Sequence, residues 1–166
     1  FDAFVRTASI ETPQGWPDLP TYLGDLKAAL ERLHVFKAHP LDQSLRGGSQ
    51  TTQPLLYSDA PAIKAFFRAI DAPIRDYMTA IGTGDDPLRA RNTGSYRIKG
   101  AWSVRLRASD YHIDHIHPQG WLGVPVLLND ADNLRATCPA LPMPLVSTAP
   151  GQSRISRTAR SKWSSS

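Results

Sequence analysis

The feature that most constrains this chain is a histidine-rich segment between two strand-like runs. The whole chain has five histidines, and three of them fall within six residues of this segment: His112, His115 and His117. Before them, apolar and polar side chains alternate over residues 102–107, which is the period of a half-buried strand. After them, an apolar run extends to Leu128. Neutral imidazole is the commonest protein metal ligand, so this segment predicts a metal site at the mouth of a β-sheet.

The spacing of these side chains suggests which of them would bind together. In an extended segment, residues two apart share a face, so His115 and His117 point the same way. His112 and Asp114 form a second pair of opposite parity. Pro118 and two β-branched isoleucines disfavour a helix here. The alternative interpretation is a polar surface turn that is merely rich in histidine.

At these residues the sequence resembles a family of bacterial 2-oxoglutarate/Fe(II)-dependent oxygenases, often found at the end of tetratricopeptide-repeat proteins. The resemblance covers most of residues 1–122. The segments that carry it are Leu45–Thr52, Leu55–Leu56, Trp102–Arg107, Tyr111–His112, His115–Pro118 and Gly120–Leu122.

The resemblance implies an α+β fold with a double-stranded β-helix (jelly-roll) core and flanking N-terminal helices. It also implies Fe(II) as cofactor and 2-oxoglutarate as co-substrate of a dioxygenase that hydroxylates its substrate. In that family two closely spaced ligands and one distant histidine hold the iron. The close pair maps to His115 and His117, with His112 and Asp114 as the second choice.

The C-terminal part departs from the family. We expect a partial oxygenase-like domain over residues 1–128, with its late strands missing, and an irregular tail over residues 129–166. No histidine follows His117, and the tail arginines match no motif, so neither the distal iron ligand nor a co-substrate arginine is assigned. A shift of reading frame after about Leu122 would explain this, since Ser161–Ser166 can be encoded by codons that read as Gln-Val-Val-Leu-Phe-Pro in another frame. We therefore expect the printed chain to be inactive and aggregation-prone.

Two other functions remain open. A cupin-like metal protein also uses His-x-His, but with a glutamate a few residues later, and residues 118–129 contain none. A non-enzymatic remnant or binding module would keep the jelly-roll fold and show no dependence on metal or 2-oxoglutarate.

Local patterns predict the elements around this segment. An edge strand is expected over residues 4–10, and a helix capped by Asp18 is expected after it. A second helix is expected to begin near residues 58–61, where a cap residue precedes Pro61, to be kinked or split near Pro73 and to stop at Gly82. The Gly47-Gly48 pair predicts a turn with positive φ. His34 and His39 are expected to be capping or surface residues.

Charge and cysteine content narrow the class of protein. Five basic and two acidic side chains in residues 130–166 give +3 of the net charge of +4, which leaves +1 for the rest of the chain. The basic balance is thus a property of the tail, and a nucleic-acid partner is disfavoured. The sole cysteine, Cys138, excludes a disulfide within the chain. No apolar run has the length of a membrane span, so the cytoplasm is the expected compartment.

Overall fold

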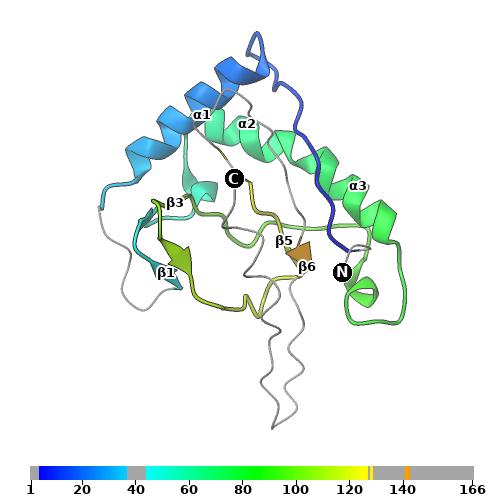
Figure 1. Ribbon diagram of the computed structural model, residues 1–166. Coiled ribbons are helices and arrows are strands. Elements are labelled where there is room, and N and C mark those ends of the chain that lie inside the picture. The colour runs from blue at the N-terminus through cyan, green and yellow to red at the C-terminus, as the bar shows by residue number, and fades with distance from the viewer. Residues whose placement is uncertain (1–3, 37–43, 127, 129–140, 143–166) are drawn as a thin grey trace.

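The computed structural model describes residues 4–36, 44–126, 128 and 141–142. Three helices form one side of the molecule, and short strands joined by long extended segments form the other (Figure 1). The helices are α1 (Leu19–Leu33), α2 (Pro61–Ala69) and α3 (Asp71–Ile81), with short 3-10 helices η1 (Leu55–Tyr57) and η2 (Arg89–Arg91). The strands are β1 (Leu45–Arg46), β2 (Ser49–Gln50), β3 (Val104–Arg105), β4 (Tyr111–His112), β5 (Leu122–Gly123) and β6 (Leu141–Pro142).

Helix α1 begins where its cap residue predicts. Asp18 has an extended backbone, and its Oδ1 accepts a hydrogen bond from the Thr21 amide at 2.8 Å. This bond satisfies one of the amides that have no partner in the first turn of a helix. The helix then buries one face, which contains Tyr22, Leu23 and Leu26. The predicted helix and its cap are confirmed.

The second predicted helix is divided into α2 and α3. α2 begins at Pro61, within the predicted starting region, but its cap position is Ala60, which makes no side-chain capping bond. The break comes at Ile70, three residues before Pro73. Proline has no amide hydrogen, and its ring crowds the carbonyl four residues earlier, so the helical hydrogen-bond pattern is interrupted there. Gly82 ends α3 with a φ of +63°, and the Asn92 side-chain amide donates to the carbonyls of Met78 and Gly82.

The main core lies between the helices. Helix α1 packs on α2, and the Tyr22 hydroxyl donates a hydrogen bond to the Ala62 carbonyl at 3.2 Å within this interface. Ile63 of α2 is fully buried, and Ile74 and Met78 extend the core along α3. Three helices packed on one core give the molecule a continuous helical layer, which supports the strand side.

The strands form three antiparallel pairs. β1 pairs with β4, β2 with β3 and β5 with β6. The chain passes from β1 to β2 through Gly47 and Gly48, whose φ angles of +73° and +59° confirm the predicted turn. β6 is a two-residue pairing within the segment expected to be irregular, and that expectation stays a prediction. The jelly-roll core and the boundary at residue 128 stay predictions, because most of the tail lies outside the described residues.

Two segments with strand-like patterns form no continuous strand. In residues 4–10, where an edge strand is expected, only Arg6 makes a strand-like bridge, and residues 96–99, where apolar and basic side chains alternate, form no strand. Residues 102–107 form a strand only at β3, and the half-buried pattern that was predicted is wrong, because the apolar side chains and both arginines are exposed. Trp102, Val104 and Leu106 are 44%, 37% and 49% exposed. The alternation is real, but its apolar face has no covering layer among the described residues.

Of the helices that the structure describes, none combines the length and the apolar character needed to span a lipid bilayer.

Candidate metal centre

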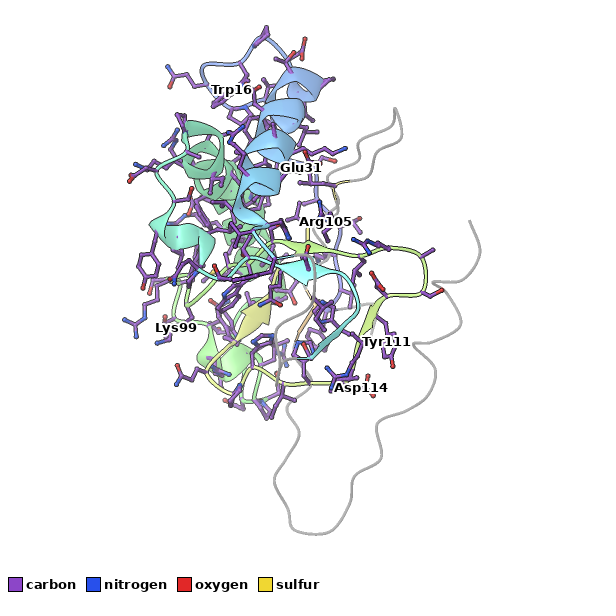
Figure 2. All side chains as sticks on the ribbon, turned by 90° about the vertical axis from the view of Figure 1, so that its left-hand side faces the viewer. Trp16, Glu31, Lys99, Arg105, Tyr111 and Asp114 are labelled. Carbon is purple, nitrogen blue, oxygen red and sulfur yellow. The ribbon has the colours of Figure 1, made fainter. Side chains whose placement is uncertain are left out.

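The histidine turn is held at both ends by main-chain hydrogen bonds. β4 pairs with β1 so that His112 lies opposite Leu45, and the Ile113 amide donates to the Ser44 carbonyl at 2.8 Å. At the other end, the Gly120 amide donates to the His117 carbonyl at 2.8 Å. Figure 2 shows Tyr111 and Asp114 in this region, away from helix α1. The turn therefore projects its side chains into solvent from a fixed base.

The structure brings the three imidazoles together in series. The ring centroids of His112 and His115 are 5.6 Å apart, and those of His115 and His117 are 5.0 Å apart. The predicted pair is therefore the closer one. All three residues are exposed. His115 is the central ring, so any metal held by two of these imidazoles would involve it.

The tautomer of His115 follows from its hydrogen bond. Its Nδ1 lies 2.9 Å from the Ile113 carbonyl oxygen, which can only accept. Nδ1 therefore carries the proton, and the lone pair of Nε2 is left for another partner. Metal-binding histidines commonly have this arrangement, in which a carbonyl fixes the ring through one nitrogen while the other binds the ion.

His112 has a different environment. Its Nδ1 lies 3.0 Å from the Ser44 hydroxyl. Partial burial lowers the pKa of His112, and the nearby His115 ring lowers it further. The second-choice pair of His112 and Asp114 is not assembled into a larger site. Within residues 4–36, 44–126, 128 and 141–142, no three His, Cys, Asp or Glu side chains are arranged to hold a metal ion.

His34 has a role that the sequence did not reveal. It is the C-cap of α1, as expected, and its amide donates to the Glu31 carbonyl. Its ring also bridges two serines, with Nδ1 2.8 Å from the Ser49 hydroxyl and Nε2 3.0 Å from the Ser103 hydroxyl. These partners are 15 and 69 residues away, so no local pattern could have indicated the contact. His34 ties α1 to the β2–β3 pair, whereas His39 lies outside the described residues.

The environment of His34 predicts a pH-dependent stability. Burial lowers its pKa below the ordinary value of 6.5, the charge of Arg105 lowers it further, and Glu31 opposes this shift. Below pH 6.5 the unfolded chain therefore binds more protons at this residue than the folded chain does, so the free energy of unfolding falls as the pH is lowered. We expect urea unfolding at pH 7.5 and pH 5 to show a smaller loss for His34→Gln than for the unmodified protein. An equal loss in both proteins would contradict this assignment.

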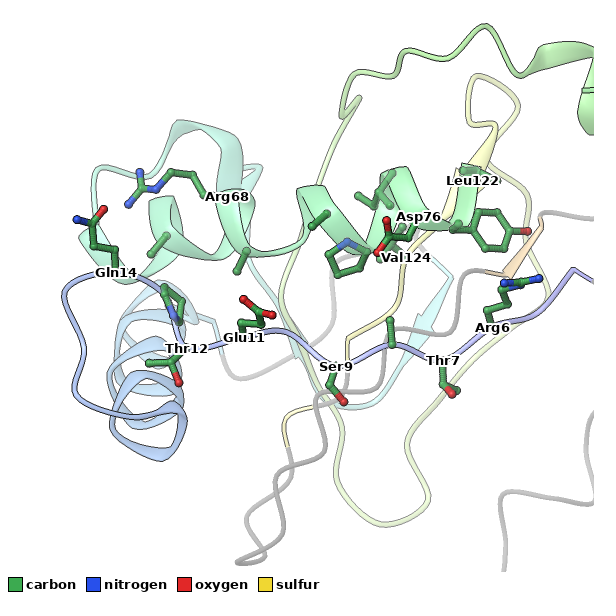
Figure 3. A pocket seen from close by; sticks show the side chains of 18 residues that line it. Arg6, Thr7, Ser9, Glu11, Thr12, Gln14, Arg68, Asp76, Leu122 and Val124 are labelled. Atoms are coloured by element: carbon green, nitrogen blue, oxygen red, sulfur yellow. The ribbon is translucent and has the colours of Figure 1, made fainter. Parts of the chain in front are cut away.

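A cavity lies along helices α2 and α3. It has a volume of 580 Å³ and lies between the extended N-terminal segment and helices α2 and α3. Figure 3 shows Glu11, Arg68 and Asp76 among the side chains that line it. No histidine is among the described residues of its wall, so we treat it as separate from the candidate metal centre. No sequence pattern indicated it, because its walls come from distant segments.

No protein-family model, curated protein or solved structure matches this chain.

Proposed function

We propose that this chain is a partial Fe(II)/2-oxoglutarate-dependent dioxygenase (hydroxylase) domain in which His115 and His117 form a divalent-metal site. The single observation that carries the proposal is the hydrogen bond from Nδ1 of His115 to the Ile113 carbonyl. This bond leaves the lone pair of Nε2 for a metal, and the ring of His117 lies beside that of His115. The resemblance of most of residues 1–122 to the oxygenase family supplies the identity of the metal.

The residues present fit part of the iron site that this family implies. Two imidazoles suit Fe(II), but a complete facial site needs a third protein ligand. The described part of the chain provides no group of three. When bound, iron with 2-oxoglutarate would supply the oxidising chemistry of substrate hydroxylation. The chain's own contribution is to bind and orient the metal, and we propose that it does not turn over 2-oxoglutarate.

The second candidate is a non-enzymatic binding module in the same fold. The exposed apolar face of residues 102–106 favours it, because such faces commonly mark interaction sites. A cupin-like protein is less well supported, since no glutamate follows the histidine pair.

We propose the cytoplasm as the compartment, because the chain has a single cysteine and so cannot form an internal disulfide.

The proposal is tested by metal binding and co-substrate turnover measured together. We expect Co²⁺, used as a spectroscopic substitute for Fe(II), to produce visible absorption bands on binding, with no succinate formed from 2-oxoglutarate in the presence of Fe(II). A chain re-encoded in the alternate frame after Leu122 is the matched comparison, and we expect turnover only there. Sustained turnover by the printed chain would contradict the partial-domain assignment. An absence of metal binding in both chains would favour the binding module.

A further inference from the structure

One edge of the strand that contains β3 has no main-chain partner among the described residues. The Thr51 amide donates to the Ser103 carbonyl at 3.0 Å, and the Leu55 amide donates to the Ala101 carbonyl at 2.7 Å. Residues 101 and 103 therefore turn their main-chain groups toward the segment that follows β2. In an antiparallel pair the next residues point the other way, so the Val104 amide and carbonyl face the open edge. Such an edge is a template for another strand.

The side chains beside this edge are apolar on one face. Trp102, Val104 and Leu106 lie on that face, and each is more than one-third exposed. Their alternation places them where every second side chain of an added strand would contact them.

The opposite face is basic. Residues 95–109 contain four basic side chains and no acidic one. Arg105 and Arg107 are exposed and alternate with the apolar residues. The nearest acidic residue, Asp110, already accepts a hydrogen bond from the Arg107 amide at 2.8 Å through its carboxylate. The open edge therefore has an apolar face and a positively charged face.

We propose that this edge binds an extended segment of another polypeptide in which acidic and apolar residues alternate. Such a segment would pair with the main chain of residues 102–106, place its apolar side chains beside Trp102 and Val104, and place its carboxylates beside Arg105. The proposal goes beyond the metal site, since none of these residues is in the histidine pair.

Charge disfavours two other occupants of this edge, a second copy of the chain and residues 143–166 of the same chain. A second copy paired through the same edge would place its basic face beside the basic face of the first copy, and neighbouring like charges across a strand pair are destabilising. Residues 143–166 of the same chain contain four basic and no acidic side chains, so they would bring like charges to the basic face. A single-stranded nucleic acid would match the charge, but of the three exposed side chains on this face Trp102 alone offers a ring for base stacking, and Val104 and Leu106 are aliphatic.

The test uses a fluorescein-labelled nonapeptide of alternating glutamate and valine, with binding followed by anisotropy. We expect binding that weakens with added salt. Methylating the peptide amides along one edge should reduce affinity by at least about tenfold, since main-chain hydrogen bonds are lost. The lysine–valine peptide and a thymidine 12-mer are the controls for charge and for nucleic acid, and we expect neither to bind.

Substitutions in the chain test whether the peptide binds at the open edge beside β3. Val104→Pro removes the outward amide, whereas Val104→Thr keeps the amide and the β-branched shape. We expect binding to be lost in the first and retained in the second. Arg107→Glu should weaken binding by at least about threefold. Arg6→Glu makes the same change of charge beside the cavity along α3 and should leave binding unchanged. Equal affinity for the N-methylated peptide, tighter binding of the 12-mer, or self-association that excludes the peptide would each overturn the proposal.

Discussion

Replacing His115 with alanine is expected to lower the affinity of the chain for Zn²⁺ and Co²⁺ by more than about tenfold. Loss of an outer partner of a metal ligand commonly costs about 10- to 100-fold, and loss of the ligand itself removes a coordination bond outright. His115 is the central ring of the three, and its Nδ1 contacts the Ile113 carbonyl, which leaves Nε2 for a metal. Isothermal titration at pH 7.5 measures the effect.

The neighbouring histidines provide matched comparisons. His117→Ala should reduce affinity as much as His115→Ala does, because the two rings form the closer pair. His112→Ala should have a smaller effect, since the Ser44 hydroxyl already contacts its Nδ1. If His112→Ala and Asp114→Asn abolished binding while His117→Ala did not, the second-choice pair would be the site.

Replacing Gly48 with alanine is expected to destabilise the fold strongly. The φ of Gly48 is +59°, and a Cβ there would lie 2.2 Å from the main-chain carbonyl oxygen of Arg105. Backbone strain alone costs about 1–3 kcal/mol, and the clash with main chain adds to it. The turn also joins β1 to β2, which pair with β4 and β3. We therefore expect the free energy of unfolding in urea to fall by about 3 kcal/mol or more.

Substitutions at two other glycines separate the cost of backbone strain from the cost of the steric clash. Gly94 has a φ of +76° with no atom within 4 Å of an added Cβ, so Gly94→Ala should show the cost of strain alone. Gly24 has no positive φ and the same open space within α1, so Gly24→Ala should stabilise the protein by about 1 kcal/mol. If Gly48→Ala cost no more than Gly94→Ala, the close approach of the turn to Arg105 would be wrong.

The elements that were predicted correctly depend on neighbouring residues. Asp18 caps α1, Pro61 begins α2 and Gly82 ends α3, because a cap or a proline acts within one turn of its own position. The Gly47-Gly48 turn belongs to the same class, since positive φ is a preference of the residue itself.

The predictions that failed depend on contacts between segments that are distant in the sequence. Alternation over residues 102–107 identifies two faces but does not show that either is covered, and here Trp102, Val104 and Leu106 are exposed, as are both arginines. The bridge from His34 to Ser49 and Ser103 depends on contacts between distant segments. In the candidate site, spacing correctly indicated that His115 and His117 lie together. The closeness of His112 was not expected, because parity alone placed it on the other face.

The most direct test of the metal site is long-range ¹H–¹⁵N correlation NMR of the histidine rings, recorded before and after addition of Zn²⁺. We expect His115 to show a protonated Nδ1 before addition, and the Nε2 resonance of His115 to shift together with a ring nitrogen of His117 at equal metal concentrations. A His115 protonated at Nε2, or Zn²⁺ shifts confined to His112 or to residues outside 112–117, would contradict the proposal that this pair is a metal site.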